Sequence, residues 1–148
     1  MRILHFIGLS GIGGVERQFQ RFITFFSAHR DEFKEYSHAV LAYTNTIHPD
    51  IKRDIAAGAS AIHIFKKTFP DIFLPPLIRP YRCRRIFSAH SYDVLLTTSI
   101  LRNPIQEKTI RLFPGLKIFY DKGWSSQHTE KKKDKLIYSV GLDITPNL

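Results

Sequence analysis

Short apolar runs alternate along the chain with stretches of helical periodicity. The apolar runs predict six strands, at residues 2–7, 37–43, 61–65, 93–98, 116–120 and 143–145. The stretches between them predict helices, at residues 15–28, 49–57, 81–90, 104–113 and 129–140. The first of these carries its apolar residues at i, i+4, i+7, i+8 and i+11, which makes one stripe of Val15, Phe19, Phe22, Ile23 and Phe26. Residues 67–80 contain four prolines and predict an irregular loop.

This alternation of strand and helix determines the expected fold class. Consecutive strands separated by helices form a mostly parallel sheet with helices on both faces. We therefore predict an α/β, Rossmann-like fold, built as a single domain over residues 1–148. No helix follows the last predicted strand, so the chain is expected to be a piece of something longer.

The composition is that of a globular protein and excludes several classes. The chain has 148 residues, of which 43% are hydrophobic and 24% charged, enough for one core. No apolar run approaches the roughly 20 residues needed to cross a bilayer. The single cysteine, Cys83, rules out an internal disulfide framework, and we expect it to be a buried, inert thiol. These features predict a cytoplasmic protein.

The net charge of +9 is concentrated in the second half of the chain. Residues 1–74 contain nine basic and seven acidic side chains, whereas residues 75–148 contain 13 and six. A basic half attracts phosphates, nucleic acid or an anionic membrane. Arg79, Arg82, Arg84 and Arg85 form the densest cluster, and Arg82 and Arg85 share a helix face as candidates for binding an anionic acceptor. The alternative for these arginines is a solvated helix face. The lysines at residues 131–135 form a second basic run, which is either an exposed helix surface or a peripheral contact with an anionic membrane.

A glycine-rich turn follows the first predicted strand. Gly8, Gly11, Gly13 and Gly14 let the backbone approach a ligand, and the helix that follows offers unpaired N–H groups to an anion. Ser10 could donate a hydrogen bond there. A P-loop is excluded because Gly14 is followed by Val-Glu, and the dinucleotide fingerprint lacks its third glycine and its acidic residue. The alternative is a tight turn that binds nothing.

Two further groups of residues are weaker candidates. Asp121 and Lys122 follow the strand predicted at 116–120, where Asp121 could act as a base and Lys122 as a phosphate contact. A surface turn packed around Trp124 is the alternative. The histidines show no metal-ligand spacing, and His5 and His63 lie inside predicted strands, where we expect core positions.

The first 22 residues, MRILHFIGLSGIGGVERQFQRF, resemble the opening of a glycosyltransferase family 4 enzyme with the GT-B fold. Gly13, Gly14 and Glu16 match the Gly-Gly-x-Glu turn of that family residue by residue. The segments SYDVLLTTS, KIFYDKGWS and GLDITPNL resemble later segments of its amino-terminal domain. The chain departs from the family where Asp121-Lys122-Gly123 stands at a position that often carries histidine.

The resemblance implies the acceptor-side, amino-terminal domain of a retaining glycosyltransferase. The complete enzyme would transfer a sugar from a nucleoside-diphosphate sugar to a hydroxyl acceptor, a saccharide or lipid-linked saccharide, in cell-surface polysaccharide or lipopolysaccharide biosynthesis. The glycine turn would line the cleft and stabilise charge on the leaving diphosphate. The family binds most of its donor through a second domain with a basic pair and a Glu-x(7)-Glu motif. The resemblance therefore implies that this donor-binding domain is missing here, and the chain alone is expected to be inactive.

The same resemblance sets the expected partners. No Asp-x-Asp occurs, which favours a mechanism without metal, and no cofactor is expected. The protein would be cytoplasmic, with a peripheral contact at the inner face of the cell membrane, and no nucleic acid is expected. The alternative function is a basic α/β module that binds phosphate-rich ligands, either nucleic acid or an anionic membrane.

Overall fold

The computed structural model describes residues 1–44, 46–64, 75–97 and 104–119. Within them, strands and helices alternate along the chain. The strands are β1 (Arg2–Ile7), β2 (Ser37–Ala42), β3 (Ala61–Ile64), β4 (Val94–Thr97) and β5 (Leu116–Phe119). The helices are α1 (Gly14–Ala28), α2 (Pro49–Gly58), α4 (Pro75–His90) and α5 (Pro104–Arg111).

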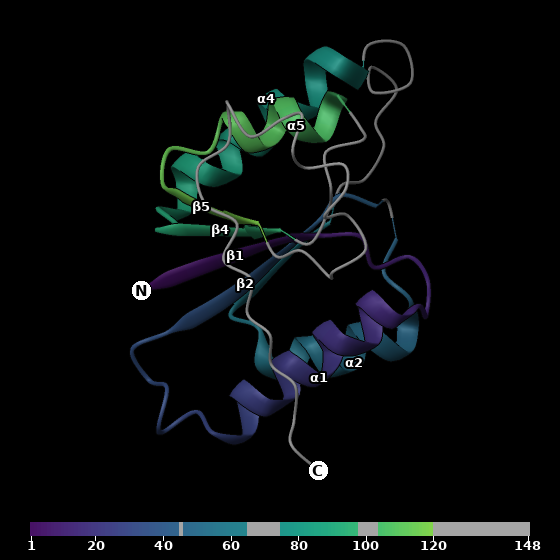
Figure 1. The fold of residues 1–148 in the computed structure, drawn as a ribbon, viewed down its shortest axis with the longest axis vertical. Helices are drawn as coiled ribbons and strands as arrows, with labels where there is room; N and C mark the ends of the chain where they lie inside the picture. The colour runs from purple at the N-terminus through teal and green to yellow at the C-terminus, as the bar shows by residue number, and fades with distance from the viewer. Residues whose placement is uncertain (45, 65–74, 98–103, 120–148) are drawn as a thin grey trace, which may run out of the picture.

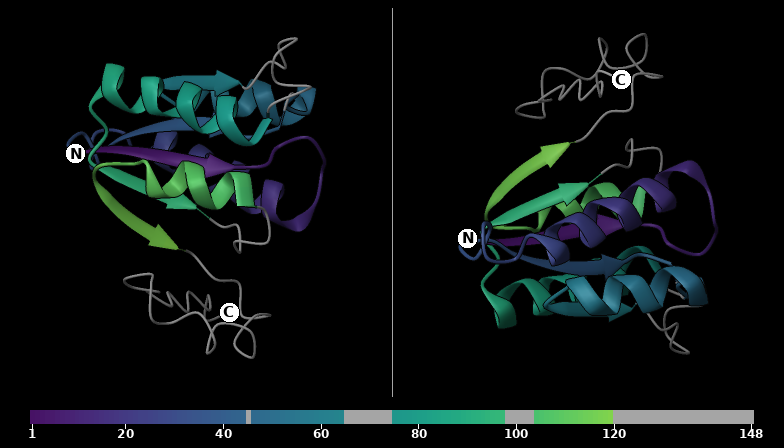
Figure 2. Two further views of the ribbon diagram at one scale, coloured as in Figure 1. Left: turned by 90° about the horizontal axis from the view of Figure 1, so that it is seen from above. Right: turned by 90° about the horizontal axis from the view of Figure 1, so that it is seen from below.

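The strands form one parallel sheet in the order β3-β2-β1-β4-β5, with β1 in the centre. Figure 1 shows α1 and α2 on one face of this sheet and α4 and α5 on the other. The two further views in Figure 2 show the strands running side by side between the two helical layers. The prediction of a parallel sheet covered on both faces is therefore confirmed.

Each face of the sheet has its own hydrophobic core, because neighbouring strand residues point to opposite sides. Leu4 and Phe6 of β1 belong to the core beneath α4 and α5, together with Phe87 and Phe113. The core beneath α1 and α2 combines strand residues with the apolar stripe of α1, and its buried members are Ile7, Leu9, Phe19, Ile23, Val40, Ala42, Ile47, Ile51 and Ile55. Ile23 is fully buried, as the periodicity of α1 predicts.

The prediction of an irregular loop at residues 67–80 is wrong for the last six residues, since α4 begins at Pro75. Proline is tolerated in the first turn of a helix, where the missing N–H has no partner in any case. Pro80 lies farther in, where proline removes a backbone hydrogen bond, but its side chain is buried. Packing therefore overrides the helix-breaking tendency on which the prediction relied. Residues 67–74 lie outside the described residues.

The remaining boundaries agree with the sequence to within one or two residues. α1 begins one residue early, at Gly14, and α2 includes Gly58, which was expected just past its end. The helix predicted at 129–140 and the strand at 143–145 lie outside the described residues. In the part of the chain that is described, no helix has both the length and the apolar character to cross a bilayer.

Candidate functional site

The glycine turn lies at the carboxyl edge of the sheet, between β1 and α1. β1 is flanked by β2 and β4, and the helices that follow β1 and β4 in the chain, α1 and α5, lie on opposite faces of the sheet (Figure 1). Open parallel sheets bind ligands at such a switch point, beyond the carboxyl ends of the strands. The turn predicted as a ligand site therefore lies at the edge where this fold builds its sites.

Glu16 folds back over the glycines that precede it. A Cβ placed on Gly13 would lie 2.6 Å from Glu16 Oε2, and one placed on Gly11 would lie 3.7 Å from Glu16 Oε1. Gly13 is the residue that caps α1, and Glu16 is the acidic residue of its first turn. A carboxylate at this end of a helix is stabilised by the helix dipole. The negative group at the start of α1 thus comes from the chain itself, and Gly13 leaves room for it.

The predicted residues of the turn are accessible, with Glu16 half-buried. Ser10 is exposed, and so are Gly13 and Gly14. A Cβ on Gly14 would meet no atom within 4 Å. The predicted residues Ser10, Gly13, Gly14 and Glu16 are therefore brought together on one accessible turn.

The segment after β2 braces the turn, a feature that the sequence analysis did not identify. The Leu9 N–H donates to Thr44 Oγ1 at 3.3 Å, and the Leu9 carbonyl accepts from the His48 N–H at 2.8 Å. Thr44 Oγ1 in turn donates to the Thr46 carbonyl at 2.9 Å. These bonds tie the turn after β1 to the loop after β2. In the sequence, the only sign of these contacts is the position of the polar residues. They come directly after the strand that pairs with β1, so they reach the same edge of the sheet as the glycine turn.

Tyr43 packs directly on the first glycine of the turn. A Cβ on Gly8 would lie 2.7 Å from Tyr43 Oη and 2.8 Å from its Cζ. The ring also packs on Phe6, with 5.2 Å between the ring centroids. Gly8 is therefore needed for packing against an aromatic ring, as well as for any approach of a ligand.

Arg82 and Arg85 lie on the other side of the sheet from helix α1. Both belong to α4. The end of α4 lies at the amino edge of the sheet, because Arg2 Nη1 donates to the His90 carbonyl at 2.8 Å. The predicted arginines and the predicted glycines therefore do not converge on one site among the described residues.

The outer face of α4 carries a shallow hollow of about 420 Å³. Tyr81, Arg84, Arg85, Ser88 and Ala89 line it, and they follow helical spacing. Tyr81 is a large aromatic side chain that is 65% exposed. Arg85 is thus in the hollow, as a neighbour of Arg84, whereas Arg82 does not line it.

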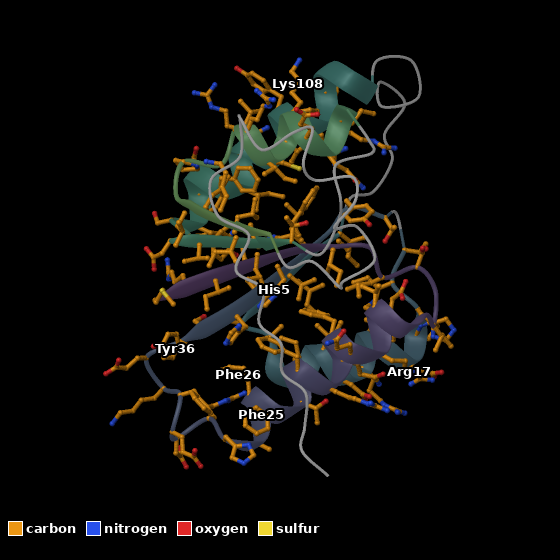
Figure 3. All side chains as sticks on the ribbon, viewed as in Figure 1. His5, Arg17, Phe25, Phe26, Tyr36 and Lys108 are labelled. Carbon is orange, nitrogen blue, oxygen red and sulfur yellow. The ribbon has the colours of Figure 1, made fainter. Side chains whose placement is uncertain are left out.

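The charge asymmetry of the sequence becomes an asymmetry between the two helical layers. α4 contains four arginines and no acidic residue, and α5 adds Lys108, Arg111 and Glu107. Glu107 and Arg111 form an ion pair across one turn, with Nη2 and Oε1 2.6 Å apart. α1 and α2 together hold four basic and three acidic side chains. The basic surface of the described chain therefore lies over α4 and α5; Lys108 on α5 marks this side in Figure 3.

The single cysteine is buried, as predicted. Cys83 is 2% exposed on the inner side of α4, and burial raises the pKa of its thiol to about 12. A thiol with so high a pKa is a poor nucleophile at neutral pH. His5 is also buried as expected, whereas His63 is only partly buried and bonds to Tyr92 Oη at 2.8 Å.

Two predicted candidates cannot be placed. Asp121 and Lys122 lie outside the described residues, as do Trp124 and the lysines at 131–135. Within the described ranges, no three His, Cys, Asp or Glu side chains gather in a way that could hold a metal ion.

The fold and the site define the class of protein as a Rossmann-like α/β domain with a glycine turn at its carboxyl edge. Comparisons with protein-family models, curated proteins and solved structures give no match. The glycosyltransferase resemblance therefore stays a prediction.

Proposed function

We propose that this chain forms the acceptor-side domain of a GT-B glycosyltransferase that uses a nucleoside-diphosphate sugar. The observation that carries the proposal is the Gly-Gly-x-Glu turn at the carboxyl edge of β1. There Gly13 leaves room for Glu16, and both remain accessible to a ligand. The parallel sheet with β1 at its centre is the architecture that the proposal needs.

In this proposal Glu16 accepts a hydrogen bond from a hydroxyl of the acceptor sugar. A carboxylate accepts hydrogen bonds and repels a second anion, so a neutral hydroxyl suits its position better than a phosphate. Ser10 is exposed on the same turn and supplies a further hydroxyl. The proposed place of action is the cytoplasm, with sugar transfer onto a cell-surface glycan or its lipid-linked precursor.

The binding part of the proposal is tested by NMR with the isotope-labelled chain. UDP-glucose, GDP-mannose and a neutral oligosaccharide such as maltotriose are titrated separately, and the amide signals are followed. The proposal expects maltotriose to shift the amides of residues 8–16 and of Thr44. Glu16→Gln is expected to weaken this binding, with Arg21→Gln on the exposed side of α1 as the matched control. Shifts confined to α4, or no shift with any probe, would contradict it.

The two-domain part of the proposal has its own test. The coding DNA is read past the codon of Leu148. In the family that the chain resembles, a Glu-x(7)-Glu motif lies in the donor-binding domain, so an open frame of about one domain's length that encodes such a motif supports the proposal. A stop codon without a separate chain that supplies the donor domain contradicts it.

A second candidate function is favoured by the hollow on α4. Arg84 and Arg85 line it beside Tyr81, on a helix that carries no carboxylate. Guanidinium groups bind phosphate in a bidentate manner, so this surface suits a phosphate-rich ligand. This is the anion-binding module that the basic half of the sequence also suggests.

Salt-dependent retention on a heparin column separates the two candidates. Replacing Arg84 and Arg85 by serine is expected to reduce the slope of log affinity against log salt by about 2 if both contact the polyanion. Arg21→Ser, on the opposite layer, is the single-charge control. If the slope falls by the same amount per removed charge in Arg21→Ser, only the overall charge of the chain matters and the hollow is not the binding site.

A further inference from the structure

Two histidines from neighbouring strands form a buried pair beneath α1. His5 of β1 and His38 of β2 are 2% and 6% exposed. His5 Nε2 lies 2.9 Å from His38 Nδ1, so one ring donates a hydrogen bond to the other. Such a bond needs one N–H and one free lone pair, which two neutral imidazoles provide.

The pair is enclosed by aromatic rings of α1. The ring centroids of Phe19 and Phe22 lie 5.0 and 5.3 Å from that of His5, and Phe26 lies 4.3 Å from His38. Figure 3 shows His5 on the side of the sheet that faces α1, with Phe26 on the helix. His38 Nε2 is buried and finds no hydrogen-bond partner among the described residues.

No charged group of the described residues is placed to neutralise a proton on this pair. On β1 His5 is flanked by Leu4 and Phe6, and on β4 Leu96 lies in register with it. On β2 the neighbours of His38 are Ser37 and Ala39, which carry no charge. On α1 the charged side chains are Glu16, which lies over the glycine turn, and two exposed arginines, Arg17 and Arg21.

Protonation of the pair is therefore unfavourable in the folded state. Burial, and secondarily His38, lowers the pKa of His5 to about 3, and burial also lowers the pKa of His38. The unfolded or opened chain binds the proton at the ordinary pKa of about 6.5. The neutral pair therefore contributes its full stability to the closed, folded state above about pH 6.5. This contribution is lost as the pH falls from there toward the lowered pKa of the folded state. At pH 5, His5 alone shifts the equilibrium toward the open form by about 30-fold.

We propose that the His5–His38 pair is a proton-sensitive latch that holds α1 and the glycine turn on the sheet. Water reaches the imidazoles most directly when the helix that covers them lifts away. α1 begins at Gly14, so its release also opens the turn that precedes it. The latch does not depend on which ligand the turn binds.

Hydrogen exchange of the intact chain tests this latch between pH 8 and pH 5. After correction for the intrinsic exchange rate at each pH, opening of the α1 amides is expected to increase about 30-fold. The amides of α5, on the opposite face and without a histidine, serve as the internal reference. Equal increases in α1 and α5 would show global unfolding and would overturn the latch.

Two further measurements identify the groups responsible. The double variant His5→Leu with His38→Leu is expected to abolish the acid-induced opening of α1. His63→Gln removes another histidine whose pKa is lowered by burial, beside Tyr92, and is expected to leave the opening of α1 unchanged. Side-chain NMR of the unmodified chain requires no substitution. A His5 ring that titrates near pH 6.5 in the folded protein would refute the proposal.

Discussion

Replacing Gly8 by alanine is expected to destabilise the fold by about 1–3 kcal/mol, the usual cost of overpacking a filled site. The new methyl group would lie 2.7, 2.8 and 3.1 Å from Oη, Cζ and Cε2 of Tyr43. These three atoms belong to one rigid ring, so relief requires the whole side chain to move. Such a movement disturbs the packing of Tyr43 on Phe6, whose ring centroid is 5.2 Å away.

A double-mutant cycle measures this contact by urea denaturation. The free energies of unfolding are compared for the unmodified chain, Gly8→Ala, Tyr43→Leu and the double variant. Leucine lacks the ring atoms that the methyl group would meet. The double variant is therefore expected to lose less free energy of unfolding than the two single variants lose together. The coupling energy is expected to fall between about 0.5 and 3 kcal/mol, the range for residues in contact.

Gly14→Ala is the matched control for this cycle. Gly14 is the first residue of α1, and a Cβ there would meet no atom within 4 Å. Alanine in place of glycine in a helix is expected to stabilise the chain by up to about 1 kcal/mol. Additive effects of Gly8→Ala and Tyr43→Leu, to within about 0.5 kcal/mol, would refute the proposed packing.

Two other predictions concern the packing of the helices. Gly58→Ala is expected to cost about 2 kcal/mol in urea denaturation, because its Cβ would lie 2.5 Å from Ile23 Cγ2 and 2.8 Å from the Ile23 carbonyl oxygen on the neighbouring helix; an unchanged midpoint would contradict this. Cys83, whose pKa is raised to about 12 by burial, is expected to react with a thiol reagent at pH 8 only after urea is added. Rapid labelling of the native chain would show that the thiol is accessible.

The fold could be predicted because its signals are local. Apolar runs, the stripe on α1 and the proline at the start of α2 each mark an element within a few residues of sequence. The start of α4 could not be predicted in this way, because Pro75 and Pro80 favour a loop locally and burial of Pro80 against the rest of the fold is not visible in the sequence.

The candidate site was predicted only where its residues are close in sequence. Gly13 and Glu16 are three residues apart, and their contact follows from one helical turn. His5 and His38 are 33 residues apart, and they meet only because β1 and β2 pair in a particular register. A shift of the register by one residue would point one of them to the other face of the sheet. Pairs of this kind require the strand order and register, which no local pattern contains.

The position of Glu16 also bears on how the proposed enzyme would divide its ligands. Backbone N–H groups at a helix start attract anions, but here the carboxylate of Glu16 lies over Gly13 at that start. A diphosphate would therefore meet a negative charge at this turn, whereas a hydroxyl would meet a hydrogen-bond acceptor. The diphosphate would then need its positive partners elsewhere. This arrangement of charge favours the acceptor at this turn, and it disfavours the role in stabilising the leaving diphosphate that the resemblance also implies for the turn.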